Sequence, residues 1–270
     1  MAENWRLIRD GNHGAPFNMA LDEAIMRAHA DGRCGPTLRL YGWACPAVSL
    51  GYFQRPEDRS LDIQYCRKAG IELVRRPTGG RAVLHGHDLT FSIIIAEDQL
   101  PPESRSVLGS HRWLMNGIVA ALRNVGLAAH VGGDGRTTRP PRSADCFTHA
   151  GACDVLVGSR KVAGSAQARR WGVVLEQGSM PFRRADVQLS RVFLGKYGQN
   201  DGISLFPDRF KRESLVRAVV RGMREDLGIR LVDGTPLESE LFDAEGLAES
   251  KFGTEEFTLR AQSAHVDNHR

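Results

Sequence analysis

The chain has 270 residues, of which 41% are hydrophobic, and its formal net charge is +4 at pH 7. No apolar run is long enough to cross a bilayer, and the N-terminus lacks the basic start and apolar stretch of a secretory signal. Lys and Arg are interleaved with Asp and Glu and form no stripe with aromatic residues, which argues against nucleic acid as a partner. We therefore expect a globular cytoplasmic protein with no membrane association.

The first half of the chain contains both predicted strands and predicted helices. Asn18 is expected to cap a helix whose apolar residues recur at three- to four-residue spacing. Apolar runs predict strands at residues 5–8, 37–41, 47–50, 71–74 and 89–95. A short helix at 62–68 precedes the fourth strand, and residues 106–125 give the longest helical pattern.

A hairpin is predicted in the middle of the second half. The dipeptide Gly158-Ser159 fits a tight turn between strands at 154–157 and 160–163. Residues 132–142 combine glycines, prolines and arginines without periodicity, so we expect a mobile loop there.

The C-terminal part gives helical patterns at 209–226 and 236–250, and the polar tail 261–270 is expected to be disordered. Strands and helices mixed without regular alternation favour an α+β domain, and no internal repeat is present.

The glycine motif RRPTGGRAVLHG occupies residues 75–86, directly after a predicted strand. Gly79 and Gly80 allow close backbone approach to a ligand, while Arg75, Arg76 and Arg81 supply positive charge. An anionic or carbonyl-bearing ligand fits this pattern, and so does a plain tight turn with solvated arginines. The motif is no Walker loop, because no Gly-Lys-Ser/Thr follows it.

Lys161 begins a run with unusually small side chains. Strand alternation predicts that Lys161, Ala163, Ser165 and Gln167 share one face of the strand. The small residues would leave room for a ligand beside the lysine, but a lysine in a hairpin also fits a charge on a sheet edge.

The five cysteines are scattered, and their odd number and the lack of a CxxC pair argue against disulfides and structural zinc. Cys146 follows the arginine-rich loop and precedes His149, a setting in which a thiol can ionise and act as a nucleophile. A small buried hydrophobe is the alternative for Cys146. His85 and His87 form an HxH pair with no evident third ligand, so no metal site is predicted.

These motifs resemble the lipoyl and biotin protein ligase superfamily, in its lipoate-ligase and octanoyltransferase branch. Residues 75–85, 88–92 and 161–167 carry the resemblance, and residues 18–23 and 49–54 match more weakly. The resemblance implies a mixed-sheet α+β catalytic domain at 1–207, with a helical C-terminal extension at 208–260 packed on it. It further implies an acyl tunnel between the glycine motif and the hairpin, with these substrate-binding residues: Arg75, Arg76, Thr78, Gly79, Gly80, Arg81, His85, Gly164, Ser165 and Ala166.

Within this branch the resemblance favours the octanoyltransferases, in which a cysteine in a Cys-Phe context precedes the lysine. Cys146 would then be the nucleophile, and Lys161 would hold the acyl carbonyl. Lipoate ligases typically carry a third glycine where this chain has Arg81, so we expect no cofactor. ATP and Mg would be needed only in the ligase alternative.

The partners implied are octanoyl-acyl carrier protein as donor and a lipoyl domain as acceptor, either the glycine cleavage H protein or a 2-oxoacid dehydrogenase E2. The enzyme is expected to act as a monomer by passing the octanoyl group through Cys146 to a lysine. The general base is unassigned, with His149 a candidate by sequence proximity alone. Two further alternatives are an octanoyl amidotransferase between lipoyl-domain proteins and a non-catalytic module that binds lipoyl domains.

Overall fold

The computed structural model describes residues 4–55, 61–132, 154–182, 189–194 and 211–260. The strands are β1 (Asn4–His13), β2 (Thr37–Trp43), β3 (Ala47–Leu50), β4 (Glu72–Arg75), β5 (Val83–His85), β6 (Asp88–Ala96), β7 (Ala129–Val131), β8 (Val155–Val157), β9 (Arg160–Arg170), β10 (Val173–Pro181) and β11 (Arg230–Gly234). The helices are α1 (Ala15–Ala30), α2 (Ile63–Lys68), α3 (Val107–Asn124), α4 (Leu189–Val192), α5 (Arg212–Leu227), α6 (Glu238–Leu247) and α7 (Glu255–Leu259).

Eight strands form the main sheet in the order β11-β1-β2-β6-β10-β9-β8-β7. β1 pairs in parallel with β2 and β11, and the other neighbours are antiparallel. Strands β4, β3 and β5 form a smaller sheet. This mixed architecture with flanking helices confirms the predicted α+β class.

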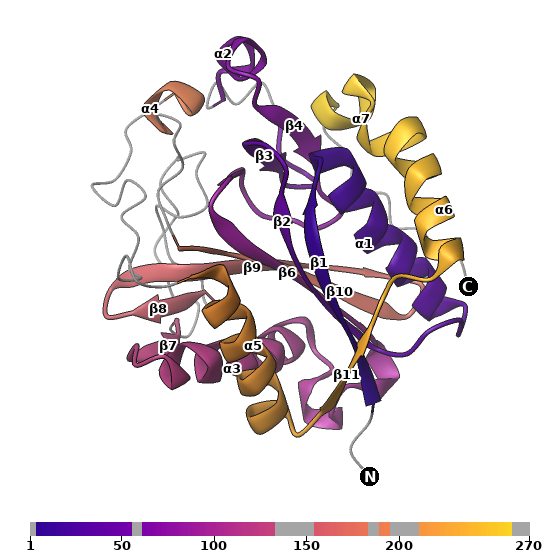
Figure 1. The fold of residues 1–270 in the computed structure, drawn as a ribbon, viewed down its shortest axis with the longest axis vertical. Helices are drawn as coiled ribbons and strands as arrows, with labels where there is room; N and C mark the ends of the chain where they lie inside the picture. Colours follow the sequence, from indigo (N-terminus) through magenta and orange to yellow (C-terminus); the bar gives the residue numbers. More distant parts are fainter. Residues whose placement is uncertain (1–3, 56–60, 133–153, 183–188, 195–210, 261–270) are drawn as a thin grey trace.

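Helices cover both faces of the main sheet. Figure 1 shows α3 and α5 together on one face, while α1, α6 and α7 lie on the opposite side. Within the described residues no helix has both the length and the apolar character needed to cross a membrane.

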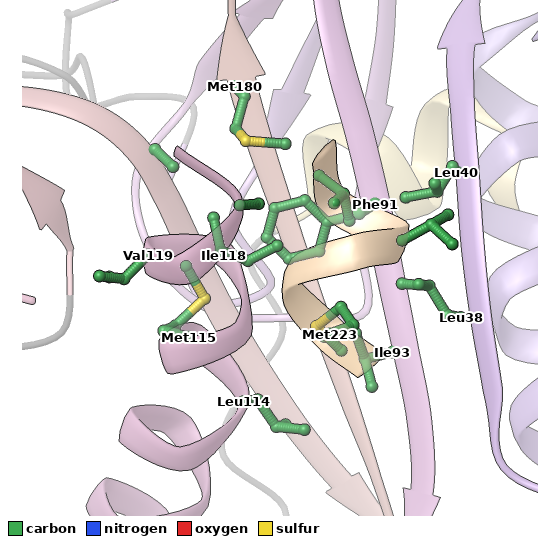
Figure 2. Packing of buried hydrophobic residues seen from close by; sticks show 14 of the residues in the cluster. Leu38, Leu40, Phe91, Ile93, Leu114, Met115, Ile118, Val119, Met180 and Met223 are labelled. Carbon is green, nitrogen blue, oxygen red and sulfur yellow. The ribbon is translucent and has the colours of Figure 1, made fainter. Parts of the chain in front are cut away.

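The larger core lies between the main sheet and the pair α3 and α5. Phe91 and Ile93 of β6 point into it, where they meet residues of α3 and Met223 of α5 (Figure 2). Burying an apolar side chain of this size stabilises a fold by about 1.5–3 kcal/mol. Because strand residues alternate between faces, their neighbours Thr90 and Ser92 point to the α1 side.

Several predicted elements need correction. Helix α1 begins at Ala15 and not after Asn18, whose side-chain nitrogen instead donates to the carbonyls of His13 and Gly42. β5, β7, β10 and β11 were not predicted from the sequence. β10 was missed because the buried polar residues Glu176 and Gln177 interrupt its apolar pattern.

The C-terminal segment is an integral part of the fold and not only a helical extension packed on it. α5 packs against α3, and β11 adds an edge strand beside β1. The tail at 261–270 lies outside the described residues.

A buried polar network lies on the α1 side of the main sheet, centred on Arg39 and Asp22. Arg39 Nη1 lies 2.7 Å from Asp22 Oδ1, and neither side chain is exposed. Arg39 also pairs with Asp10 at 2.8 Å and donates to both side-chain and backbone oxygens of Asn18. The motif at residues 18–23 therefore holds α1 on β2.

Asp22 also joins the other strands of the sheet. It accepts hydrogen bonds from Tyr41 (2.9 Å), Ser92 (2.8 Å) and Gln177 (2.7 Å), which come from β2, β6 and β10. Since buried charges are tolerated only when they are paired and fully hydrogen-bonded, this saturation is what permits the ion pair in the core.

We expect Arg39→Met to lower the free energy of unfolding by about 3–5 kcal/mol, because it leaves the Asp22 carboxylate buried without its cation. The matched control is Arg9→Met, which removes a cation from an exposed pair with Asp233, whose side chains are 53% and 69% exposed. Chemical denaturation should show a change below about 1 kcal/mol for the control. Equal effects of the two substitutions would contradict the central role of Arg39.

Candidate active site

A cavity lies on the α1 side of the main sheet, between that sheet and the small sheet. Its volume is about 50 Å³, which is room for several water molecules. The surface of its walls is mostly apolar, although several polar side chains contribute to it. The lining residues are Met19, Tyr41, Trp43, Ser49, Arg76, Gly80, Val83, His85, Thr90, Gly164, Ser165, Ala166, Gln177, Gly178 and Ser179.

The glycine loop, defined as residues 78–81, is shaped by close backbone packing. Gly80 has a φ of 90°, which a residue with a side chain rarely adopts. A Cβ on Gly51 would lie 1.9 Å from the Gly80 carbonyl oxygen, so the two chain segments touch through bare backbone. The motif at residues 49–54 and the glycine motif are therefore halves of one structure.

Arg75 is fully buried and bonded to backbone carbonyls. Its Nη1 donates to the carbonyl oxygens of Gly51 (2.7 Å), Tyr52 (2.9 Å) and Gln54 (2.8 Å), and its Nε donates to Phe257 at 3.1 Å. The resemblance implied that Arg75 binds substrate. In the structure it ties the 51–54 turn to α7.

Arg76 is also largely buried, yet it borders the cavity. Its Nη1 donates to the carbonyl oxygen (2.9 Å) and the hydroxyl (3.2 Å) of Ser49, and its Nη2 donates to the carbonyls of Gly79 (2.6 Å) and Arg81 (2.8 Å). One guanidinium thus fixes the loop and places positive charge beside the Ser49 hydroxyl. Arg81 is half-buried at the same loop.

Thr78 connects the loop to the buried network. Its hydroxyl donates to Gln177 Oε1 at 2.9 Å, and Gln177 Nε2 donates in turn to Asp22 at 2.7 Å. Two hydrogen bonds therefore join the glycine loop to the Arg39–Asp22 ion pair.

A hydrogen-bonded chain of Ser49, His85 and Asp88 begins at the cavity wall, which Ser49 and His85 line. His85 Nε2 lies 2.8 Å from Ser49 Oγ, and His85 Nδ1 lies 2.8 Å from Asp88 Oδ2. All three residues are buried, and the indole of Trp43 stacks on the imidazole at 3.9 Å. The ring is thereby fixed in both orientation and plane.

Asp88 is held by more donors than His85 alone. Thr90 and Ser179 donate to Oδ2 at 2.8 and 2.7 Å, and the Gly86 amide donates to Oδ1 at 3.0 Å. Burial by itself would raise the pKa of Asp88, but the electrostatic interaction with His85 and these hydrogen bonds outweigh it and lower the pKa to about 2. The carboxylate is therefore ionised at any pH near neutrality.

Lys161 is on the opposite face of β9 from the one predicted. Leu156 pairs with Lys161 while its neighbour Val155 pairs with Ala163, so β9 carries one extra residue at Val162. This β-bulge reverses the alternation and turns Lys161 to the side of Gly164. The expectation that Lys161 shares a face with Ala163, Ser165 and Gln167 is wrong, because simple alternation does not foresee a bulge.

The Lys161 ammonium lies next to the cavity. It forms a 2.9 Å ion pair with Asp154, its side chain is only 3% exposed, and a Cβ on Gly164 would lie 2.8 Å from Nζ. β9 is paired on both sides, so the alternative of a solvated charge on a sheet edge is also wrong.

Gly164, Ser165 and Ala166 all border the cavity, but they face different ways. The Ser165 hydroxyl turns to α3, where it lies 3.2 Å from His111 Nε2 and 3.1 Å from Met115 Sδ. Ala166 faces the glycine loop, 3.8 Å from a Cβ built on Gly80. Small residues on this face therefore leave the cavity open.

Cys146, Cys153 and His149 lie outside the described residues, so the predicted nucleophile is not placed by the structure. The three described cysteines are poor candidates, because burial raises the pKa of Cys34 and Cys66 to about 11 and also raises that of Cys45. Thiols with raised pKa values carry little thiolate at neutral pH.

Within the described part of the chain, no cluster of His, Cys, Asp and Glu could hold a metal ion. Both ring nitrogens of His85 already have protein partners, at Ser49 and Asp88.

Sequence reasoning did not select Ser49, Asp88, Trp43 or Gln177 as site residues. Ser49 and Asp88 stood inside the weak motif at 49–54 and the strong motif at 88–92, so the signal was present but was not read as chemistry. Trp43 and Gln177 gave no signal, because only the sheet pairing brings them to the cavity.

The low pKa of Asp88 makes folding stability depend on acid. Its value of about 2 in the folded state is below the ordinary 3.8, so the stabilisation is fully present above about pH 4 and is lost as pH falls through 2. We expect about 2 kcal/mol of unfolding free energy to disappear over this range.

Asp88→Asn should be less stable at pH 6 and should lack that part of the acid dependence, as measured by denaturation at a series of pH values. Asp233→Asn, at an exposed carboxylate, is the control and should keep the acid dependence of the wild-type protein. An unchanged acid profile in Asp88→Asn would show that the Asp88–His85 pair does not stabilise the fold.

The chain is similar to known proteins over nearly its full length. The chain is 38% identical over 284 residues to the octanoyltransferase LipM of Symbiobacterium thermophilum, covering 96% of this chain and 100% of that protein. It is 33% identical over 278 residues to the octanoyltransferase LipM of Bacillus subtilis, at 96% and 99% coverage.

Solved structures give the same result at the level of the fold. A lipoate-protein ligase A bound with ATP superposes with a TM-score of 0.77 at 29% identity, covering 96% of this chain and 99% of that one. A bi-partite lipoate protein ligase from Thermoplasma acidophilum gives 0.73 at 28% identity, with 98% and 100% covered. The profile of the lipoyl protein ligase A/B catalytic domain matches residues 15–214, and the chain belongs to that family.

Proposed function

We propose that this protein is an octanoyltransferase that modifies a lysine of a lipoyl-domain protein. The observation that carries the proposal is the apolar cavity with two cations at hand: Arg76 in its lining, and Lys161 next to the lining residue Gly164. An acyl chain fits apolar walls, and fixed cations suit the negative charge that develops on its carbonyl oxygen. The full-length similarity to octanoyltransferases supports the choice of acyl group.

The donor is octanoyl-acyl carrier protein, and the first step is an exchange of thioesters. The Cys146 thiol ionises and its thiolate attacks the octanoyl carbonyl. The bond to the carrier's sulfur then breaks, and that sulfur leaves as a thiol after taking the proton that Cys146 released. A thioester exchange is close to balanced in energy, so it needs no nucleotide. We accordingly propose that neither ATP nor Mg takes part.

The second step transfers the octanoyl group to an amine. The lysine nitrogen of the lipoyl domain attacks the Cys146 thioester, an amide forms, and the Cys146 sulfur is released as a thiol. The glycine cleavage H protein and 2-oxoacid dehydrogenase E2 subunits are the acceptors we propose.

Lys161 serves both steps by stabilising negative charge on the carbonyl oxygen. Its ion pair with Asp154 and its contact with Gly164 fix the ammonium before substrate arrives. A preorganised charge of this kind stabilises a transition state without reorganisation, and loss of one such donor typically costs 10²–10³-fold in rate.

Intact mass spectrometry tests the proposal directly. The protein is mixed with octanoyl-acyl carrier protein in the absence of nucleotide, and we expect a mass increase of about 126 Da that disappears in Cys146→Ala. The control is Cys66→Ala, which removes a buried thiol of raised pKa and should still acquire the adduct. A protein that modifies a lipoyl domain only with ATP and free octanoic acid, and never carries the adduct, would instead be a ligase.

Gly164→Ala tests the place of Lys161. The new Cβ would lie 2.6 Å from Lys161 Cε, so the flexible side chain must move while the backbone stays. We expect the rate of Cys146 acylation to fall by about 10-fold or more, with little change in melting temperature.

Gly246→Ala, which adds a Cβ with no atom within 4 Å, is the matched control and should acylate at the wild-type rate. An unaffected Gly164→Ala would remove Lys161 from the reaction.

A further inference from the structure

The proposed second step needs a proton acceptor. A lysine amine has an ordinary pKa of about 10.4, so near neutral pH it is almost entirely an ammonium without a free electron pair. The thiolate of the first step has no such requirement. A group that accepts a proton near neutral pH must therefore lie where the amine meets the acyl carbonyl.

The described cavity lining contains three titratable side chains, those of Tyr41, Arg76 and His85. Burial and the nearby Asp22 carboxylate raise the pKa of Tyr41 well above its usual value, and its hydroxyl proton is donated to Asp22. Arg76 stays protonated at any accessible pH and has no acceptor atom. His85 is the remaining candidate in this lining.

The surroundings of His85 define which nitrogen can accept. Asp88 is ionised and accepts from Nδ1, so the ring proton lies on Nδ1 and Nε2 keeps its electron pair. Nε2 in turn receives the hydroxyl proton of Ser49 at 2.8 Å. Two charged groups lie near the ring. Asp88 fixes the tautomer of His85, and Arg76 donates a hydrogen bond to the Ser49 hydroxyl oxygen at 3.2 Å.

We propose that His85 is the general base of the second step and that the Ser49 hydroxyl relays the proton to it. This rests on the octanoyltransferase function proposed above. The acceptor ammonium gives a proton to Ser49 Oγ as Ser49 gives its own to His85 Nε2, and the freed amine then attacks. As the C–N bond forms and the C–S bond breaks, the second amine proton goes to the Cys146 sulfur. His85 later releases its proton to water.

The arrangement has the components of a Ser-His-Asp triad, but here the Ser49 hydroxyl lies between the Arg76 guanidinium and the His85 ring. Ser49 lies inside β3, is 1% exposed, and accepts from the Arg76 guanidinium. Asp88 is a positioning residue, because it acts only through the ring that it orients.

The test measures the two steps of the reaction separately in the variant His85→Gln. Gln is neutral and keeps hydrogen-bonding capacity toward Asp88 while removing the base. The octanoyl-enzyme is formed first and quantified by intact mass, then mixed with a lipoyl-domain protein in a single turnover. We expect transfer to the lysine to be slower by about 10²-fold or more at pH 7, and acylation of Cys146 to fall by a much smaller factor.

The pH profile distinguishes a base from a structural residue. Transfer by His85→Gln should rise about tenfold per pH unit toward the pKa of the amine, because the free amine must then form without a base, and wild-type transfer should depend less steeply on pH. His130→Gln, an exposed histidine of β7, is the control and should give the wild-type profile.

Three results would overturn this inference. The first is wild-type transfer with unchanged pH dependence in His85→Gln, and the second is loss of acylation and transfer in equal measure. The third is an octanoyl adduct on Ser49 in Cys146→Ala, which would make Ser49 a nucleophile. Absence of any adduct on the wild-type protein would reject the octanoyltransferase function itself.

Discussion

The ion pair between Arg39 and Asp22 is the interaction on which the rest of this structure depends. It is fully buried on the α1 side of the main sheet, where unpaired charge would be very costly. Asp22 also accepts hydrogen bonds from three strands, so helix α1 and the sheet can pack in only one register if all donors are to be satisfied. The same network reaches the glycine loop through Gln177 and Thr78, which places the loop relative to the core.

The arginines of the glycine motif have different roles: Arg75 stabilises the fold, and Arg76 also presents its charge to the cavity. Arg75 uses its donors on backbone carbonyls of the 51–54 turn and of α7, and so joins the loop to the C-terminal helices. Arg76 holds the carbonyls of Gly79 and Arg81 but also presents its charge at Ser49. A loop of bare backbone would be mobile without such ties, and catalytic groups need a supporting shell that fixes their geometry.

The sequence was sufficient for the parts of the site that rest on local chemistry. Gly158 takes the positive φ expected for the turn of the hairpin, and Gly79-Gly80 gives the close backbone approach that the motif suggested. The sequence was insufficient where the pairing of strands decides which way a side chain points. The bulge at Val162 reverses the face of Lys161, and this depends on how β8 and β9 align, which periodicity alone does not encode. Asn18 resembles a helix cap locally, yet its side chain serves Arg39 of a distant strand.

The central claim is that the cavity between the main sheet and the glycine loop holds the acyl chain. The most direct measurement loads the enzyme with an octanoyl analogue that carries a photoreactive diazirine at its end, then maps the crosslinks by peptide mass spectrometry. The account predicts crosslinks at the apolar walls of the cavity, at Met19, Tyr41, Trp43 or Val83. Crosslinks confined to α3 and α5, on the other side of the sheet, would contradict it.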